Sequence, residues 1–157
     1  MYKVGIIGPE STGKSSLARY LARRYKGTYV PEYARTYVEQ KGSTDVTFEE
    51  LCSIARYQVE ELAAISNQPS DSVYFFDTEL IVTKVWFDYA FGCVPEWFNE
   101  AIRQSPMDTY LLTYPDLPWI PDPARSNGSD AIRMELFQRY EAEIEALNIP
   151  YYIIKHT

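Results

Sequence analysis

The feature that most constrains this chain is an eight-residue stretch near its start, Gly8-Pro9-Glu10-Ser11-Thr12-Gly13-Lys14-Ser15. It fits the pattern G-x-x-x-x-G-K-[ST], in which backbone N–H groups wrap the phosphates of a nucleotide. Glycines permit that tight path because no Cβ obstructs the approach of an anion. The stretch therefore predicts a phosphate-binding loop. The expected nucleotide contacts are Gly8, Glu10, Ser11, Thr12, Gly13, Lys14, Ser15 and Ser16.

The residues on either side supply the context that such a loop needs. Residues 2–7 have the pattern of a short buried strand, and residues 16–25 that of a helix. The start of a helix offers unpaired N–H groups and the positive end of its dipole to an anion. In this arrangement Lys14 reaches the β- and γ-phosphates and the Ser15 hydroxyl holds Mg²⁺. The sequence therefore predicts that the chain binds a nucleoside triphosphate, ATP or GTP, together with Mg²⁺.

Strand and helix patterns alternate along the rest of the chain. Further strands are expected at residues 28–30, 73–76, 109–112 and 151–154, and helices at 34–40, 47–66, 78–91, 95–104 and 130–147. The uninterrupted apolar run 73–76 is typical of a parallel strand that is covered on both faces. This alternation predicts a P-loop NTPase fold of the α/β class, a three-layer sandwich in one domain over residues 1–157. The expected sheet has five parallel strands in the order 2-3-1-4-5, with helices on both faces.

Two carboxylates are expected at the carboxyl ends of strands, where ligands of such sheets bind. Asp77 follows the 73–76 run and is predicted to contact Mg²⁺ or the acceptor hydroxyl; its alternative role is a helix N-cap formed by Asp77 or Thr78. Glu32 follows the 28–30 run and is predicted to accept the proton of the acceptor hydroxyl or to bind a sugar diol. Its alternative role is a carboxylate in the first turn of the next helix. Arg35 binds a phosphate, pairs with Glu32 or is a surface cation.

The segment 114–128 is a long connection with four prolines, and it is predicted to be a lid. Arg125 on this loop is expected to stabilise the charge that develops on the transferred group. Trp119 either anchors the loop or stacks on a flat ring. Arg133 and Arg139, on the helix that follows, are weaker candidates and are expected on a solvated helix face.

Composition narrows the class of protein. A formal net charge of −7 argues against nucleic acid as a partner, which needs clustered positive charge. Cys52 and Cys93 match no metal-binding spacing and are interpreted as reduced thiols. His156 is the one histidine, so the general base is expected to be a carboxylate. With no leader and no membrane-spanning run, the chain is expected to be soluble and cytoplasmic, without a membrane partner.

The chain resembles the ribosylnicotinamide kinase domain of NadR-type proteins of NAD biosynthesis, and the resemblance covers nearly all of it. It rests on the phosphate loop and on three further stretches. These are Glu32-Tyr33-Ala34-Arg35-Thr36-Tyr37, then Phe76-Asp77-Thr78-Glu79 with Thr83-Lys84 downstream, and Pro118-Trp119-Ile120-Pro121-Asp122-Pro123-Ala124-Arg125.

The resemblance implies transfer of the γ-phosphoryl group of ATP to the 5′-hydroxyl of nicotinamide riboside, which gives nicotinamide mononucleotide. It implies that Trp119 stacks on the nicotinamide ring, that Asp77 and Asp122 lie around the ribose, and that Arg125 lies near the phosphates. The substrate contacts expected in all are Glu32, Tyr33, Arg35, Asp77, Thr78, Trp119 and Asp122.

Two other functions fit the same residues. One is a kinase of this fold that acts on a deoxynucleoside or a nucleotide, and the other is an NAD- or ATP-binding regulatory module without turnover. Bifunctional relatives carry further domains for which this chain has no room, so a stand-alone kinase is expected, and the sequence is compatible with a homo-oligomer.

Overall fold

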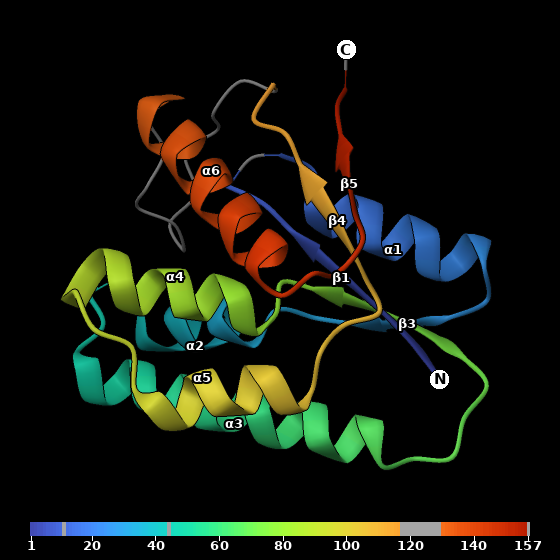
Figure 1. Ribbon diagram of the computed structural model, residues 1–157, viewed down its shortest axis with the longest axis horizontal. Helices are drawn as coiled ribbons and strands as arrows, with labels where there is room; N and C mark the ends of the chain where they lie inside the picture. The colour runs from blue at the N-terminus through green and yellow to red at the C-terminus, as the bar shows by residue number, and fades with distance from the viewer. Residues whose placement is uncertain (11, 44, 117–129, 157) are drawn as a thin grey trace.

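Five parallel strands form one sheet in the order β2-β3-β1-β4-β5 (Figure 1). This computed structural model describes residues 1–10, 12–43, 45–116 and 130–156. The strands are β1 (Tyr2–Ile7), β2 (Thr28–Val30), β3 (Val73–Asp77), β4 (Thr109–Thr113) and β5 (Tyr151–Ile154). The central strand β1 pairs with β3 on one side, with Ile6 opposite Asp77, and with β4 on the other, with Ile7 opposite Leu112. The predicted strand order and direction are confirmed.

Six helices connect these strands within the part of the chain that the structure describes. They are α1 (Lys14–Arg24), α2 (Tyr33–Lys41), α3 (Phe48–Ser66), α4 (Leu80–Phe91), α5 (Glu96–Gln104) and α6 (Asp130–Ala146). The N-terminus of α3 is a capping box, because the Thr47 side chain accepts from the Glu50 N–H while the Glu50 side chain accepts from the Thr47 N–H. At the far end of α2, Gly42 takes a left-handed φ of 79°, as helix-terminating glycines commonly do.

The expected start of a helix at residue 78 is wrong by two residues. Thr78 has φ = 71°, which is outside the helical region and is unusual for a β-branched side chain. The helix α4 therefore begins at Leu80, and its N-cap is Glu79, whose Oε1 accepts from the Ile81 N–H at 2.9 Å. The alternative role of Asp77 or Thr78 as the N-cap is wrong for the same reason.

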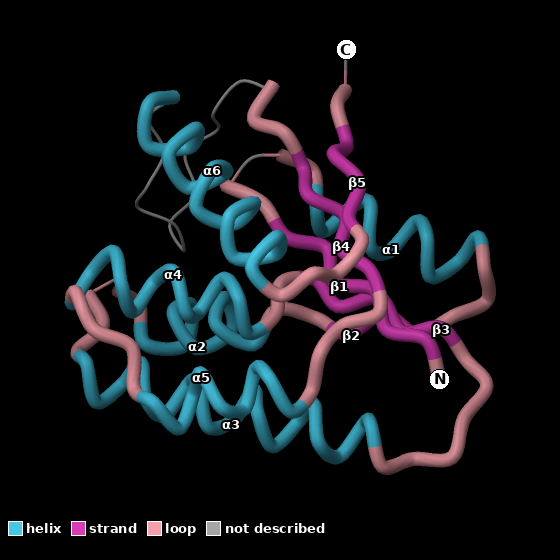
Figure 2. The backbone as a smooth tube through the Cα atoms, in the orientation of Figure 1, coloured by secondary structure: helices cyan, strands magenta, loops and turns pink. Residues whose placement is uncertain are grey.

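Helices cover both faces of the sheet, as predicted, but unequally. Among the described helices, α1 packs on one face through Ala18 and Ala22, against Val4, Ile6 and Phe75 of the strands. The core on the other face draws on α2 to α6 and contains the larger set of buried side chains. Figure 2 shows the strands in magenta between α1 and the other helices. The phosphate loop therefore emerges from the middle of the sheet, between two packed layers.

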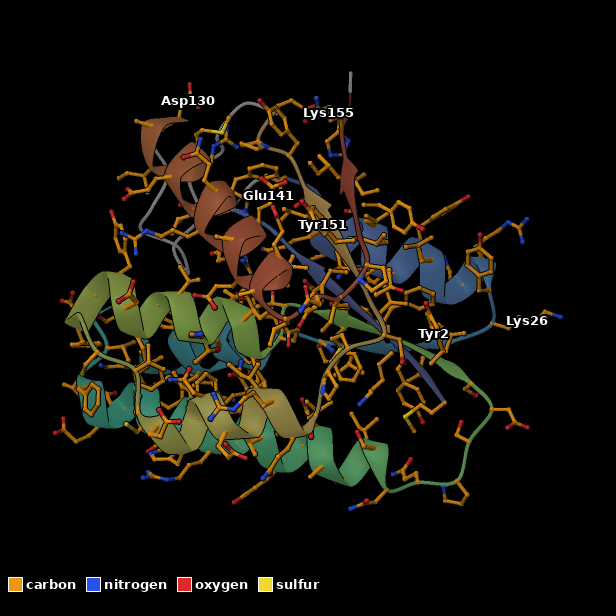
Figure 3. All side chains as sticks on the ribbon, in the orientation of Figure 1. Tyr2, Lys26, Asp130, Glu141, Tyr151 and Lys155 are labelled. Atoms are coloured by element: carbon orange, nitrogen blue, oxygen red, sulfur yellow. The ribbon has the colours of Figure 1, made fainter. Side chains whose placement is uncertain are left out.

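The edge strand β5 is tied to α6 by side-chain hydrogen bonds. The Tyr151 hydroxyl donates to Glu141 at 2.9 Å and to Glu145 at 3.0 Å, and Figure 3 shows Tyr151 and Glu141 facing each other. These contacts fix the position of α6 over the end of the sheet that carries β4 and β5. Across the described residues, every helix is too short or too polar to cross a bilayer.

Candidate nucleotide-binding site

The path of the phosphate loop is set by two glycines. A Cβ built on Gly8 would lie 2.0 Å from Oγ1 of Thr113 and 2.8 Å from its carbonyl oxygen, so only glycine fits there. Gly13 immediately precedes α1 and has a left-handed φ of 81°, a conformation that glycine adopts without strain. Both glycines of the motif are therefore required by the backbone.

The loop is held to β4 and to its own turn by Thr12. Its hydroxyl donates to the carbonyl oxygen of Pro9 at 2.7 Å and lies 2.5 Å from the hydroxyl oxygen of Thr113. Thr12 is almost fully buried, with 1% of its surface exposed. Hydrogen bonds inside a dry environment are electrostatically strong, so these two contacts stabilise the position of Thr12 in the loop.

Two side chains from distant parts of the chain contact the backbone of the same loop. Arg133 of α6 donates from Nη1 to the carbonyl oxygen of Glu10 at 3.3 Å, and Nε2 of His156 donates to the carbonyl oxygen of Thr12 at 2.8 Å. Arg133 is only 2% exposed and also pairs with Asp130 at 3.1 Å. The expectation that Arg133 lies on a solvated face is therefore wrong. Arg139, by contrast, pairs with Asp88 at the surface, as expected.

The loop leads into a pocket of about 400 Å³ at the carboxyl end of the sheet. Its wall joins the start of α1, the ends of β2 and β3 and the first turn of α2. The lining residues are Glu10, Thr12, Gly13, Lys14, Ser15, Ser16, Arg19, Tyr29, Pro31, Glu32, Arg35, Thr36 and Asp77. The structure thus brings together, in one pocket, nine of the residues predicted from the sequence. Gly8 is not among the lining residues, but it lies against Thr113 and so sets the path of the loop.

The start of α1 presents positive charge to this pocket. Lys14, its first residue, is buried and lines the pocket. Gly13 has no side chain that could cap the helix, and the first turn contains no acidic residue. The N–H groups of the first turn and the Lys14 ammonium therefore favour an anionic ligand.

Asp77 lies at the end of β3, beside the strand that leads into the loop. Its side chain is 1% exposed, and Oδ2 accepts a hydrogen bond from the Tyr29 hydroxyl at 2.8 Å. Its other oxygen, Oδ1, is buried and has no hydrogen-bond partner among the described residues. A buried carboxylate oxygen without a partner is costly unless a ligand or cation satisfies it.

Glu32 ends the connection from β2 and occupies the N-cap position of α2, but its side chain makes no capping hydrogen bond. It is 7% exposed and lines the pocket. The alternative prediction, that Glu32 is a carboxylate in the first turn of this helix, is therefore wrong, because Glu32 precedes that turn. Arg35 lines the same pocket and pairs with Glu39 one turn on, at 3.1 Å.

Tyr33 and Thr78 line a second, much smaller cavity of about 20 Å³, next to the main pocket. The Tyr33 ring is stacked on that of Tyr57, with centroids 3.7 Å apart. Glu79 lines this cavity too, and burial raises the pKa of its carboxyl to about 7, while the hydrogen bond from the Ile81 N–H acts in the opposite direction. The two predicted substrate contacts therefore lie beside the main pocket.

Four predicted site residues lie outside the residues that the structure describes. These are Ser11, Trp119, Asp122 and Arg125, and the predicted lid is described only at residues 114–116.

Sequence reasoning missed Arg19 and Tyr29 in the pocket wall. Arg19 had a signal, because it lies four residues after Ser15 and so on the same side of α1. Tyr29 had none, since a three-residue strand does not indicate which neighbouring side chain a hydroxyl reaches.

The donor set fits Mg²⁺ held together with a nucleotide. Mg²⁺ prefers oxygen ligands and is usually bound through one or two carboxylates plus substrate phosphates. The Ser15 hydroxyl and Oδ1 of Asp77 are such donors in the same pocket. No group of three or more His, Cys, Asp or Glu side chains that could hold a metal by itself is found among the described residues.

The strand order, the phosphate loop and the pocket together define a P-loop NTPase fold. A family model described as "AAA domain" matches residues 3–157, so the chain belongs to this family.

NadR is among the known proteins that this chain is similar to. The Trifunctional NAD biosynthesis/regulator protein NadR of Escherichia coli (strain K12) is 27% identical over 151 residues, which cover 94% of this chain and 37% of NadR. This chain thus spans well under half the length of that relative. The resemblance to NadR-type proteins that the sequence predicted is confirmed as a similarity over nearly the whole chain.

Solved structures share the fold. A NadR protein in complex with NAD and AMP-PNP superposes with a TM-score of 0.77 at 23% identity, covering 97% of this chain and 44% of that one. A NadR protein in complex with NR superposes with a TM-score of 0.75 at 23% identity, covering 97% of this chain and 45% of that one. Thymidylate kinase from Ehrlichia chaffeensis superposes with a TM-score of 0.67 at 13% identity, covering 99% of this chain and 89% of that one.

Proposed function

We propose that this chain is an ATP-dependent kinase that phosphorylates the 5′-hydroxyl of nicotinamide riboside and forms nicotinamide mononucleotide. The observation that carries the proposal is the composition of one pocket. It combines the phosphate loop and Lys14 with two carboxylates, Glu32 and Asp77, from the ends of neighbouring strands. Phosphoryl transfer requires mainly such positioning and charge neutralisation.

Four residues of the pocket are assigned tasks in this reaction. Lys14 and the N–H groups of α1 bind the β- and γ-phosphates and offset their charge. Ser15 and Asp77 would hold Mg²⁺, which when bound neutralises charge that develops on the phosphates. Glu32 orients the acceptor hydroxyl and accepts its proton, a role that is supported by its being a buried carboxylate that lines the pocket. Arg125, in the predicted lid, is proposed to stabilise the transferred group.

The similarity to NadR supports nicotinamide riboside as the acceptor. One NadR structure contains NR, and another contains NAD with AMP-PNP. The nicotinamide ring of the riboside is cationic, and a tryptophan face together with carboxylates favours a cationic ring. Trp119 and Asp122 are the residues proposed to bind it.

The experiment that tests the proposal is an ADP-release assay with a panel of acceptors. We expect nicotinamide riboside to be phosphorylated with a kcat/KM well above that of thymidine, deoxycytidine or deoxyadenosine, with a product of the mass of nicotinamide mononucleotide. A deoxynucleoside that performs far better would identify the chain as a deoxynucleoside kinase. Tight NAD binding by calorimetry without ADP release from any acceptor would identify a regulatory module.

A second experiment tests the role of Trp119. The variant Trp119→Ala is expected to raise the KM for nicotinamide riboside by about tenfold or more, because base–aromatic stacking contributes roughly 1–3 kcal/mol. The KM for ATP should change little. Equal changes in both constants would show that Trp119 anchors the loop and does not contact the acceptor.

A further inference from the structure

Tyr29 connects the edge strand of the sheet to the carboxylate of the site. It is the middle residue of β2, and its register partner on β3 is Phe75. Asp77 is two residues further along β3, so it projects from the same face of the sheet as Phe75. The Tyr29 hydroxyl consequently reaches Oδ2 of Asp77 and donates to it at 2.8 Å.

The ring of Tyr29 also contacts a side chain of the helix α1. The guanidinium carbon of Arg19 lies 5.7 Å from the centroid of the Tyr29 ring, within the range of a cation–π interaction. Arg19, Tyr29 and Asp77 all line the nucleotide pocket. The hydroxyl is therefore presented to Asp77 by a ring that packs between a helix and a strand.

This arrangement distinguishes the two oxygens of Asp77. Oδ2 is engaged by Tyr29, whereas Oδ1 is buried and has no hydrogen-bond partner among the described residues. We infer that Tyr29 is a positioning residue: its hydroxyl, held beneath Arg19, orients the Asp77 carboxylate so that Oδ1 is left to bind the Mg²⁺ of the nucleotide. The inference rests on the proposed function, which places Mg²⁺ at Asp77.

The test measures metal binding directly and does not depend on turnover. Mn²⁺ serves as the probe, and its affinity for the complex of the full chain with AMP-PNP is measured by electron paramagnetic resonance. The variant Tyr29→Phe keeps the ring and its contact with Arg19 but lacks the hydroxyl. We expect it to bind Mn²⁺ about 10-fold more weakly, because losing a hydrogen bond that orients a metal ligand typically costs 10- to 100-fold in affinity.

The matched control is Tyr20→Phe, which removes the hydroxyl of an exposed tyrosine on α1. It should bind Mn²⁺ as the wild type does. Should Tyr29→Phe fail to fold, Arg19→Met takes its place, because it removes the contacts of Arg19 with the ring and the hydroxyl of Tyr29 but leaves that hydroxyl on the ring. Arg19→Met is then expected to weaken Mn²⁺ binding too, by a smaller factor than the one expected for Tyr29→Phe.

A double variant shows whether Tyr29 acts through Asp77. If it does, adding Tyr29→Phe to Asp77→Asn causes no further loss of Mn²⁺ affinity, because residues in one hydrogen-bonded unit are not additive. Wild-type affinity in Tyr29→Phe, or losses that multiply in the double variant, would overturn the inference while leaving the proposed function standing. A wild type whose AMP-PNP complex binds no Mn²⁺ would overturn both.

Discussion

Thr113, the last residue of β4, lies against Gly8 so closely that any side chain at residue 8 would overlap it. A Cβ there would lie 2.0 Å from the Thr113 hydroxyl oxygen. The same hydroxyl group contacts the Thr12 hydroxyl at 2.5 Å. One side chain of β4 thus contacts the phosphate loop at two points, and the loop cannot move away from β4 without losing both contacts.

The variant Gly8→Ala is expected to push the loop away from Thr113. We expect it to lower nucleotide affinity by roughly 10-fold or more and the free energy of unfolding by about 1–3 kcal/mol, as overpacking does. Calorimetric titration with ATP and thermal melting measure the two effects. The control is Gly42→Ala, where a Cβ would meet nothing within 4 Å and the left-handed φ alone costs about 1 kcal/mol. Equal losses of ATP affinity in the two variants would contradict the prediction.

The variant Lys14→Ala is expected to abolish phosphoryl transfer and to leave the fold intact. Lys14 is the buried cation of the pocket, and its removal leaves the phosphates without their main positive contact. ADP release measures transfer, and circular dichroism measures the fold. Lys26→Ala is the control, because Lys26 lies outside the pocket and points away from the molecule (Figure 3). Retained turnover in Lys14→Ala would refute the role of this residue.

Arg133 and Arg139 lie on the same helix but should differ strongly on substitution. Removal of the buried Arg133 leaves a void and takes a hydrogen-bond donor from the Glu10 carbonyl oxygen, so Arg133→Ala should cost about 2–5 kcal/mol of unfolding free energy. Arg139→Ala breaks only surface pairs and should cost within about 1 kcal/mol. Urea unfolding of both variants measures the difference. Similar costs would show that the contact between α6 and the loop is energetically unimportant.

Glu50 should make stability dependent on pH in the acid range. Its pKa is lowered from 4.5 to about 2 by hydrogen bonds from Lys41, the Thr47 N–H and Tyr37. Because the folded chain binds this proton less tightly than the unfolded chain, the stabilisation is present above pH 4.5 and is lost as the pH falls through about 2. Glu50→Gln should therefore be less stable than the wild type at pH 7, with a gap that narrows below pH 4.5 in urea unfolding. A gap that stays constant with pH would contradict this assignment.

The sheet and most helix boundaries were predictable because their signals are local. Parallel strands that are buried on both faces appear as apolar runs, and the capping box at Thr47 and Glu50 marks the start of α3 within four residues of sequence. The start of α4 was missed because Thr78 takes a left-handed conformation that its residue type does not favour.

The contacts that assemble the site were less predictable because they join distant residues. Arg133 and Glu10 are 123 positions apart, and Tyr29 and Asp77 are 48 apart. Periodicity shows which residues share a face of an element, but it does not name their partners across the sheet. The motif itself was predictable, since its glycines and lysine act within one loop.

The pairing of β1 with β3 has a consequence for how such a chain can diversify. Ile6 and Asp77 are direct register partners, so the span from the phosphate loop to the Asp77 carboxylate is fixed by a single strand-to-strand spacing. Glu32 and Arg35 come instead from the edge of the sheet, on the segment that follows the edge strand β2. Insertions or exchanges at that edge can therefore alter this side of the pocket during evolution or engineering, while the spacing between the phosphate loop and Asp77 stays unchanged.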